Sequence, residues 1–418
     1  MIQRGIATFG LDYGTCPRWL FERMVKLGQQ MCEVIVAQEG PDEFIARLAD
    51  PVWFQSLGTV LAFDWNASGL TTILTAALKE AIRGQERDLG LFICGGKGKT
   101  SLKTPDEIVR WSERMNFAPT RADALVYNSR MAAKVDSSLL QDGFQIYHHC
   151  FLFTKNGAWT VVQQGMNTAN QSARRYHWHS RNVKDLVCEP HSGIVSQTKL
   201  KYTLDLTAQK SGQNRQVSHE LISSQGYQTL VNDLVLLSKY YSPLSQMAEV
   251  SRGQQRLKLL NLANREFKWH PVVREDFSKS KYLQKILWKI YDQKPASYEK
   301  LLALEGVGPK TMRALALVAE VIYGAQTSYE DPARFSFAHG GKDGTPYPVD
   351  RATYDQTIAT MKKYVSQTKL PFSEKNKALE RLRGSEISAN PRRHLGDSRN
   401  STTPLGDGKI SAHRELPF

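Results

Sequence analysis

The sequence predicts an α/β amino-terminal domain followed by an all-α carboxyl-terminal domain. The chain has 418 residues, more than one ordinary hydrophobic core accommodates. Residues 1–210 alternate helical stretches with short apolar runs, which is typical of an α/β domain. Over residues 215–383 the apolar side chains recur at helical spacing. Residues 384–418 are polar, rich in proline and glycine and aperiodic, which predicts a disordered tail.

The amino-terminal domain contains a predicted β-hairpin. Residues 144–154 and 158–166 have the composition of strands, and Asn156 and Gly157 between them are typical turn residues. A two-residue turn at this place puts His149 opposite Gln164. Strand periodicity is also expected over the residues just before the hairpin, from residue 134.

Composition favours a polyanionic partner and excludes several classes of protein. Lys and Arg total 55 against 41 for Asp and Glu, a formal net charge of +14. Neither a signal peptide nor an apolar run long enough to span a bilayer is visible, so we expect a cytoplasmic, nucleoid-associated protein without a membrane role. The scattered cysteines fit neither a disulfide framework nor a zinc site. All five precede residue 297, so no iron–sulfur cluster is expected after it.

The stretch "LEGVGPK" (304–310) predicts a tight turn between two helices, 297–304 and 310–324. Glycine adopts backbone conformations closed to other residues, and Pro309 suits the first position of a helix. Amides at a helix amino terminus favour an anion, and Lys310 adds a full charge. An ordinary helical turn is the alternative. The predicted DNA-phosphate contacts here are Gly306, Val307, Gly308, Lys310 and Thr311.

This turn resembles the helix-hairpin-helix motif (297–324) of DNA-repair proteins, which grips backbone phosphates. In the helix-hairpin-helix glycosylases, a hairpin lysine forms a Schiff base with the damaged sugar and a later aspartate assists. The resemblance therefore implies Lys310 and Asp350 as an alternative catalytic pair. The two residues are separated by more sequence than that family usually has. Asp350 is equally well placed to cap a helix that begins near Arg351.

The strand-cleaving site is expected at "KVDSSLLQDGFQIYHH" (134–149). Phosphodiester cleavage needs a group that holds a metal or activates water, and a cation near the developing charge. The candidate catalytic residues are Lys134, Asp136, Gln141, His148 and His149, with Asp136 as ligand of Mg²⁺ or Mn²⁺. The alternative is a set of polar residues on the wet face of a hairpin.

Two further basic stretches are candidate DNA contacts. The loop "CGGKGKT" (94–100) offers Lys97 and Lys99, and it lacks the glycine at position 93 that a nucleotide-binding phosphate loop requires. We therefore expect no nucleotide cofactor. The stretch "NQSARRYHWHSRNVK" (170–184) predicts a basic, aromatic loop suited to unpaired bases, with Arg174 and Arg175 as contacts. Solvated surface segments without a ligand are the alternative in both places.

Three longer stretches, "RGIATFGLDYGTCPRWLFERMVKL", "GGKGKTSLKTPDEI" and "MAAKVDSSLLQDGFQIYHHCFLF", carry a second resemblance. Over residues 1–380 the chain is similar to an archaeal and bacterial family known as a domain of unknown function. That resemblance implies a two-part protein with DNA nuclease activity. The sequence thus predicts a DNA-repair endonuclease acting on duplexes with distorted or unpaired regions. A glycosylase/lyase and a non-catalytic DNA-binding module are the alternatives.

Overall fold

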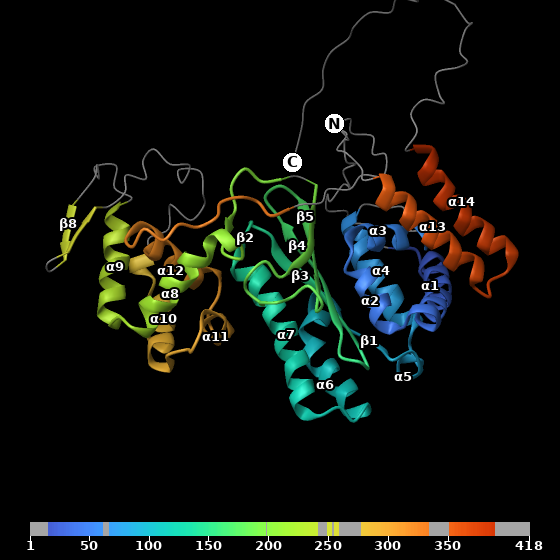
Figure 1. Cartoon of the computed structure of the whole chain (residues 1–418), viewed down its shortest axis with the longest axis horizontal. Coiled ribbons are helices and arrows are strands. Elements are labelled where there is room, and N and C mark those ends of the chain that lie inside the picture. The colour runs from blue at the N-terminus through green and yellow to red at the C-terminus, as the bar shows by residue number, and fades with distance from the viewer. Residues whose placement is uncertain are drawn as a thin grey trace, which may run out of the picture.

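A five-stranded antiparallel sheet lies at the centre of the molecule (Figure 1). The computed structural model describes residues 16–61, 67–197, 199–240, 249–252, 255–258, 277–333 and 351–388. The sheet has the order β1-β3-β4-β5-β6, and both of its faces are buried under helices. Its strands are β1 (Leu91–Lys97), β3 (Gln145–Thr154), β4 (Trp159–Asn167), β5 (Ser172–His179) and β6 (His191–Ser196).

The predicted hairpin is present as β3 and β4, but its register differs by one residue from the expected one. His149 pairs with Gln163, and Gln164 pairs with His148. The connection has three residues rather than two, because Thr154 N donates to Ala158 O across it. Gly157, the last loop residue, has a φ of +104°, a conformation that suits the third position of such a loop.

Helices from the amino-terminal part cover one face of the sheet. The apolar side of α1 packs against α4. Asp50 caps α3 by accepting the backbone N–H groups of Val52 and Trp53. These helices are α1 (Arg18–Glu39), α2 (Pro41–Leu48), α3 (Pro51–Val60), α4 (Ala67–Ala81) and the short α5 (Glu86–Leu89).

The opposite face packs against α6 and α7, and the same hydrophobic core continues into the helices that follow the sheet. The predicted boundary near residue 210 therefore does not separate two cores. The elements on this side are η1 (Gly98–Lys103), α6 (Thr104–Arg114), α7 (Pro119–Ser138), η2 (Gln209–Ser211), α8 (Gly212–Ser223), α9 (Tyr227–Tyr240), η6 (Phe277–Lys279), α10 (Lys281–Gln293), α11 (Tyr298–Ala303) and α12 (Pro309–Val321).

Two expectations about secondary structure are wrong. Residues 134–138 form the last part of α7, not a strand, because the apolar side chains of this helix pack on the sheet. The region after residue 215 is not entirely helical, since it contains a small two-stranded sheet. The short strands outside the main sheet are β2 (Leu140–Gln141), β7 (Leu204–Asp205), β8 (Glu249–Arg252) and β9 (Gln255–Lys258).

The last two described helices return to the amino-terminal core. Met361, Tyr364 and Val365 of α13 (Arg351–Gln367) are buried with the side chains of α1 and α3. Helix α14 (Phe372–Ser388) packs against α13 and α3, and it extends past residue 384, where the tail was expected to begin. The region predicted as one helical unit, 215–383, is thus divided between two cores (Figure 1).

Candidate functional site

The turn at residues 304–308 joins α11 to α12, and one of its glycines is required by the backbone. Gly306 has a φ of +87°, and a Cβ there would lie 2.6 Å from Ile286 Cδ1. Gly308 is extended, with a φ of −147°, and a Cβ there would meet nothing within 4 Å. The expectation that both glycines need special conformations is therefore wrong for Gly308. Open space lies in front of it at the start of α12.

Two side chains predicted as catalytic donate hydrogen bonds to carbonyl groups in and beside this turn. Lys134 Nζ donates to Leu302 O at 2.8 Å and Leu304 O at 2.5 Å, and lies 3.5 Å from Val307 O. Gln141 Nε2 donates to Pro309 O at 3.0 Å. Burial lowers the pKa of Lys134, which a neighbouring glutamate partly offsets. The structure therefore places Lys134 as an anchor of the turn.

Replacing Lys134 by methionine is expected to destabilise the protein by about 1–3 kcal/mol, because carbonyl groups in a half-buried position lose their donor. Methionine keeps much of the length of the side chain, so packing changes little. Urea denaturation measures the effect. Lys300→Met is the control, since Lys300 is exposed and bonds only Tyr127 Oη among the described residues. Equal stability of the two variants would contradict the anchoring role.

The predicted contacts on α12 lie together at its first turn. Lys310 is half-buried, whereas the side chains of Val307 and Thr311 are buried. The backbone N–H of Val307 donates to Leu304 O at 3.3 Å, so it is already used within the turn.

A basic and aromatic face of α10 lies beside the turn, and it was missed from the sequence. Lys281 and Lys285 are exposed, and Tyr282 is 61% exposed. Tyr282 Oη lies 3.4 Å from Gly306 O, so this face adjoins the glycine turn. The i, i+4 spacing of the two lysines is the signal that was available in the sequence.

Asp136 lies at the centre of a buried polar network between α7 and the sheet. Its Oδ2 accepts Gln163 Nε2 at 2.5 Å and Trp178 Nε1 at 3.1 Å, and its Oδ1 lies 2.6 Å from His191 Nε2. His149 extends the network, with Nδ1 2.7 Å from Gln163 Oε1. His191 lies 55 residues from Asp136, and no local pattern in the sequence links the two.

The network does not fit the predicted Mg²⁺ or Mn²⁺ site at Asp136. Three N–H donors occupy the two carboxylate oxygens, and the side chain is fully buried. Across the described ranges, no three His, Cys, Asp or Glu side chains are grouped to hold a metal ion. We therefore derive no step through a metal at this residue.

His148 points to the other face of the sheet, so the predicted catalytic residues do not form one group. Its Nε2 lies 3.2 Å from Thr75 Oγ1, and Thr75 donates its own hydroxyl to Thr71 O. Nε2 is therefore the protonated nitrogen. Burial is the main cause that lowers the pKa of His148 to about 3, so the ring is neutral.

The prediction of a basic loop with Arg174 and Arg175 is wrong. Both residues lie on β5 and are fully buried. Arg174 forms ion pairs with Asp142 and Asp331, while Arg175 Nε donates to His177 Nε2 at 2.9 Å. Neither guanidinium reaches a DNA phosphate from this position.

A model of the DUF763 family, described as proteins of unknown function, matches residues 5–349. The chain belongs to this family. No curated protein and no solved structure matches it. The matched residues include the central sheet and the turn before α12, so both features lie within the family region. The family description names no activity.

The remaining predicted positions of this family member are only partly described. Lys97 and Lys99 are exposed at the end of β1 and in η1, as DNA contacts require, and their role stays a prediction. Gly95 has a φ of +83°, and a Cβ there would lie 2.3 Å from His149 O, so this loop requires its glycine. Asp350 lies outside the described residues. No helix in the described part is long and apolar enough to cross a membrane.

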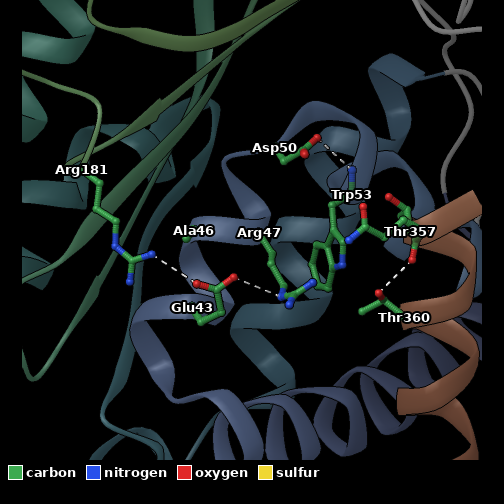
Figure 2. A pocket seen from close by; sticks show the side chains of 9 residues that line it. Glu43, Ala46, Arg47, Asp50, Trp53, Arg181, Thr357 and Thr360 are labelled. Carbon is green, nitrogen blue, oxygen red and sulfur yellow. Dashed lines mark hydrogen bonds and ion pairs between the residues drawn. The ribbon is translucent and has the colours of Figure 1, made fainter. Parts of the chain in front are cut away.

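A cavity of about 340 Å³ lies between α2, α3 and α13. Figure 2 shows the side chains that line it. Arg181 Nη1 lies 3.2 Å from Glu43 Oε2, and Arg47 Nε lies 3.5 Å from Glu43 Oε1. Arg47 Nη2 also lies 2.6 Å from Glu39 Oε2. Because these carboxylates offset the two guanidinium charges, the cavity is poorly suited to an anion.

Proposed function

We propose that this protein binds DNA through the turn at residues 304–311, used as a helix-hairpin-helix motif, and cleaves the bound DNA as a repair endonuclease. The observation that carries the proposal is the open space at Gly308. No side chain caps α12 at Gly308, and a phosphate favours the amino terminus of a helix. Phosphate contacts of this kind position a protein on a duplex without reading its bases.

The surroundings of the turn support the same ligand. Lys310 adds a cation on the first turn of α12, and the exposed Lys281 and Lys285 continue the positive charge along α10. Exposed Tyr282 adds an aromatic ring suited to stacking on an unpaired base. The net charge of +14 favours association with a polyanion at long range.

Gly308→Ala is expected to weaken binding to every duplex by about tenfold or more, because the methyl group occupies the space of a phosphate held by charge-assisted hydrogen bonds. The backbone tolerates alanine here, so the fold is kept, and the small cost of alanine at a helix N-cap is shared by the control below. Affinities are measured in about 50 and about 200 mM salt, and the variant should show the shallower salt dependence.

Gly226→Ala is the matched control. Gly226 also precedes a helix, α9, and a Cβ there would meet only Thr229 Oγ1, at 3.9 Å. Equal affinities of the wild-type protein and both variants in both salt concentrations would refute the proposed contact.

Strand cleavage is tested separately on nicked, bubbled, abasic and intact duplexes. Nicking without a covalent adduct supports an endonuclease. An adduct trapped by borohydride on abasic DNA supports the lyase that uses Lys310 instead. Binding with neither product leaves a DNA-binding module without chemistry.

A further inference from the structure

His191 connects the buried Asp136 carboxylate to the protein surface. Its Nε2 lies 2.6 Å from Asp136 Oδ1. The other carboxylate oxygen already accepts N–H groups from Gln163 and Trp178, so Asp136 acts as an acceptor toward all three neighbours. His191 Nε2 therefore carries the proton, and in the neutral ring Nδ1 keeps its lone pair.

The Nδ1 atom of His191 is not fully buried. Among the described residues no hydrogen bond involves this atom, and it is not one of the buried side-chain atoms without a partner. The side chain is 8% exposed, whereas that of Asp136 is fully buried. A molecule arriving from outside thus reaches the imidazole and not the carboxylate.

The site lies on the side of the sheet that holds the turn before α12. Gln141, which bonds Pro309 O, belongs to β2, and β2 pairs with β7 so that Leu140 lies opposite Asp205. Glu189 N, two residues before His191, donates to Thr207 O, two residues after Asp205, at 2.9 Å, so the start of β6 lies beside the end of β7. Asp136 itself is two residues from the turn's anchor, Lys134, on α7.

We infer that His191 is the general base for hydrolysis of a DNA phosphodiester, with Asp136 as its positioning residue. This inference rests on the proposed function, because the turn supplies the DNA. Water attacks phosphorus and gives a proton to His191 Nδ1. One P–O ester bond breaks, its electron pair leaves with the oxygen, and that oxygen takes a proton from solvent. His191 then returns its proton to solvent, while Asp136 keeps accepting Nε2–H.

His191→Gln separates this role from a structural one. Glutamine Nε2 still donates to Asp136, but its amide oxygen does not take up a proton at neutral pH. We expect strand cleavage to fall about 100- to 10,000-fold, the range for loss of general acid–base catalysis, with unchanged DNA affinity. Imidazole added to His191→Gly should restore part of the cleavage.

Several results would overturn the inference and leave DNA binding standing. These are cleavage by His191→Gln at the wild-type rate, DNA binding by the wild-type protein without any cleavage, and a loss of affinity in His191→Gln that equals its loss of cleavage. Failure of the proposed function is a different result, namely that the wild-type protein does not bind duplex DNA.

Nitrogen NMR of His191 gives a measurement that does not depend on activity. The wild-type ring should be the Nε2–H tautomer. Asp136→Asn can present an amide N–H to Nε2, which should shift the ring to the Nδ1–H tautomer and remove the basic lone pair from the surface. An Nδ1–H tautomer in the wild-type protein would rule out His191 as the base.

Discussion

Replacing Arg174 by methionine is expected to destabilise the protein by about 3–5 kcal/mol. Arg174 Nη1 lies 3.0 Å from Asp142 Oδ2, and Nη2 lies 2.7 Å from Asp331 Oδ2, with all three side chains fully or almost fully buried. Methionine keeps the apolar volume but leaves two buried carboxylates without their shared cation. Removing one partner of a buried ion pair in this way leaves a charge that water no longer solvates.

Urea denaturation tests this expectation, with Arg181→Met as the control. Arg181 also pairs with a carboxylate, Glu43, at 3.2 Å, but its side chain is 55% exposed. An exposed ion pair contributes about 0–1 kcal/mol, so the control should stay close to wild type. If the two variants lost equal stability, burial of the Arg174 ion pairs would not be the cause.

Acidification from about pH 7 to about pH 5 is expected to destabilise the protein through its buried histidines. Burial lowers the pKa of His148, His149 and His177 below 6.5, the ordinary value. The unfolded chain then binds more protons than the folded one below pH 6.5, so stability falls as pH falls. For His148, with a pKa of about 3, the loss at pH 5 is about 2 kcal/mol, from about 1.36 kcal/mol per pH unit.

The His148→Gln variant isolates this contribution. Glutamine can still donate to Thr75 Oγ1, the present partner of His148. Burial raises the pKa of Asp142 and Asp205, so these two carboxyl groups make the protein more stable as the pH falls. This effect is the same in the wild-type protein and in His148→Gln. The loss of stability in urea between the two pH values should therefore shrink by about 2 kcal/mol in His148→Gln. The same loss in both proteins would show that His148 does not titrate as expected.

Local signals in the sequence were sufficient for the β-hairpin and for the glycine turn. Gly157 marks a real connection between β3 and β4, and Gly306 and Pro309 mark the end of one helix and the start of the next. The serine caps of α10 and α11, Ser280 and Ser297, belong to the same class of signal. Each of these signals depends on the conformational preferences of a few consecutive residues, so it can be recognised in the sequence without knowledge of the fold.

The candidate site was predictable only as a set of residue types. Asp136 and His149 belong to one network, as the sequence predicted. His148 was predicted to lie with them, but side chains alternate along a strand, so it lies on the opposite face of the sheet. Lys134 was interpreted as catalytic because a lysine near an aspartate suits phosphodiester cleavage. Its actual partners are carbonyl groups of residues 302–307, which no pattern around residue 134 indicates.

Composition and local pattern therefore establish a basic chain with a hairpin and a glycine turn, because charge and backbone preference are properties of short stretches. Tertiary structure decides which polar groups are buried together. Arg174 is an interior cation because Asp142 and Asp331, 32 and 157 residues away, neutralise it there. His191 reaches Asp136 because α7 packs on the sheet that contains β6. A charged group or an imidazole can be buried only beside a partner that hydrogen-bonds or neutralises it, because the loss of hydration must be offset. Here these partners are distant in the chain, so only the tertiary structure brings them together.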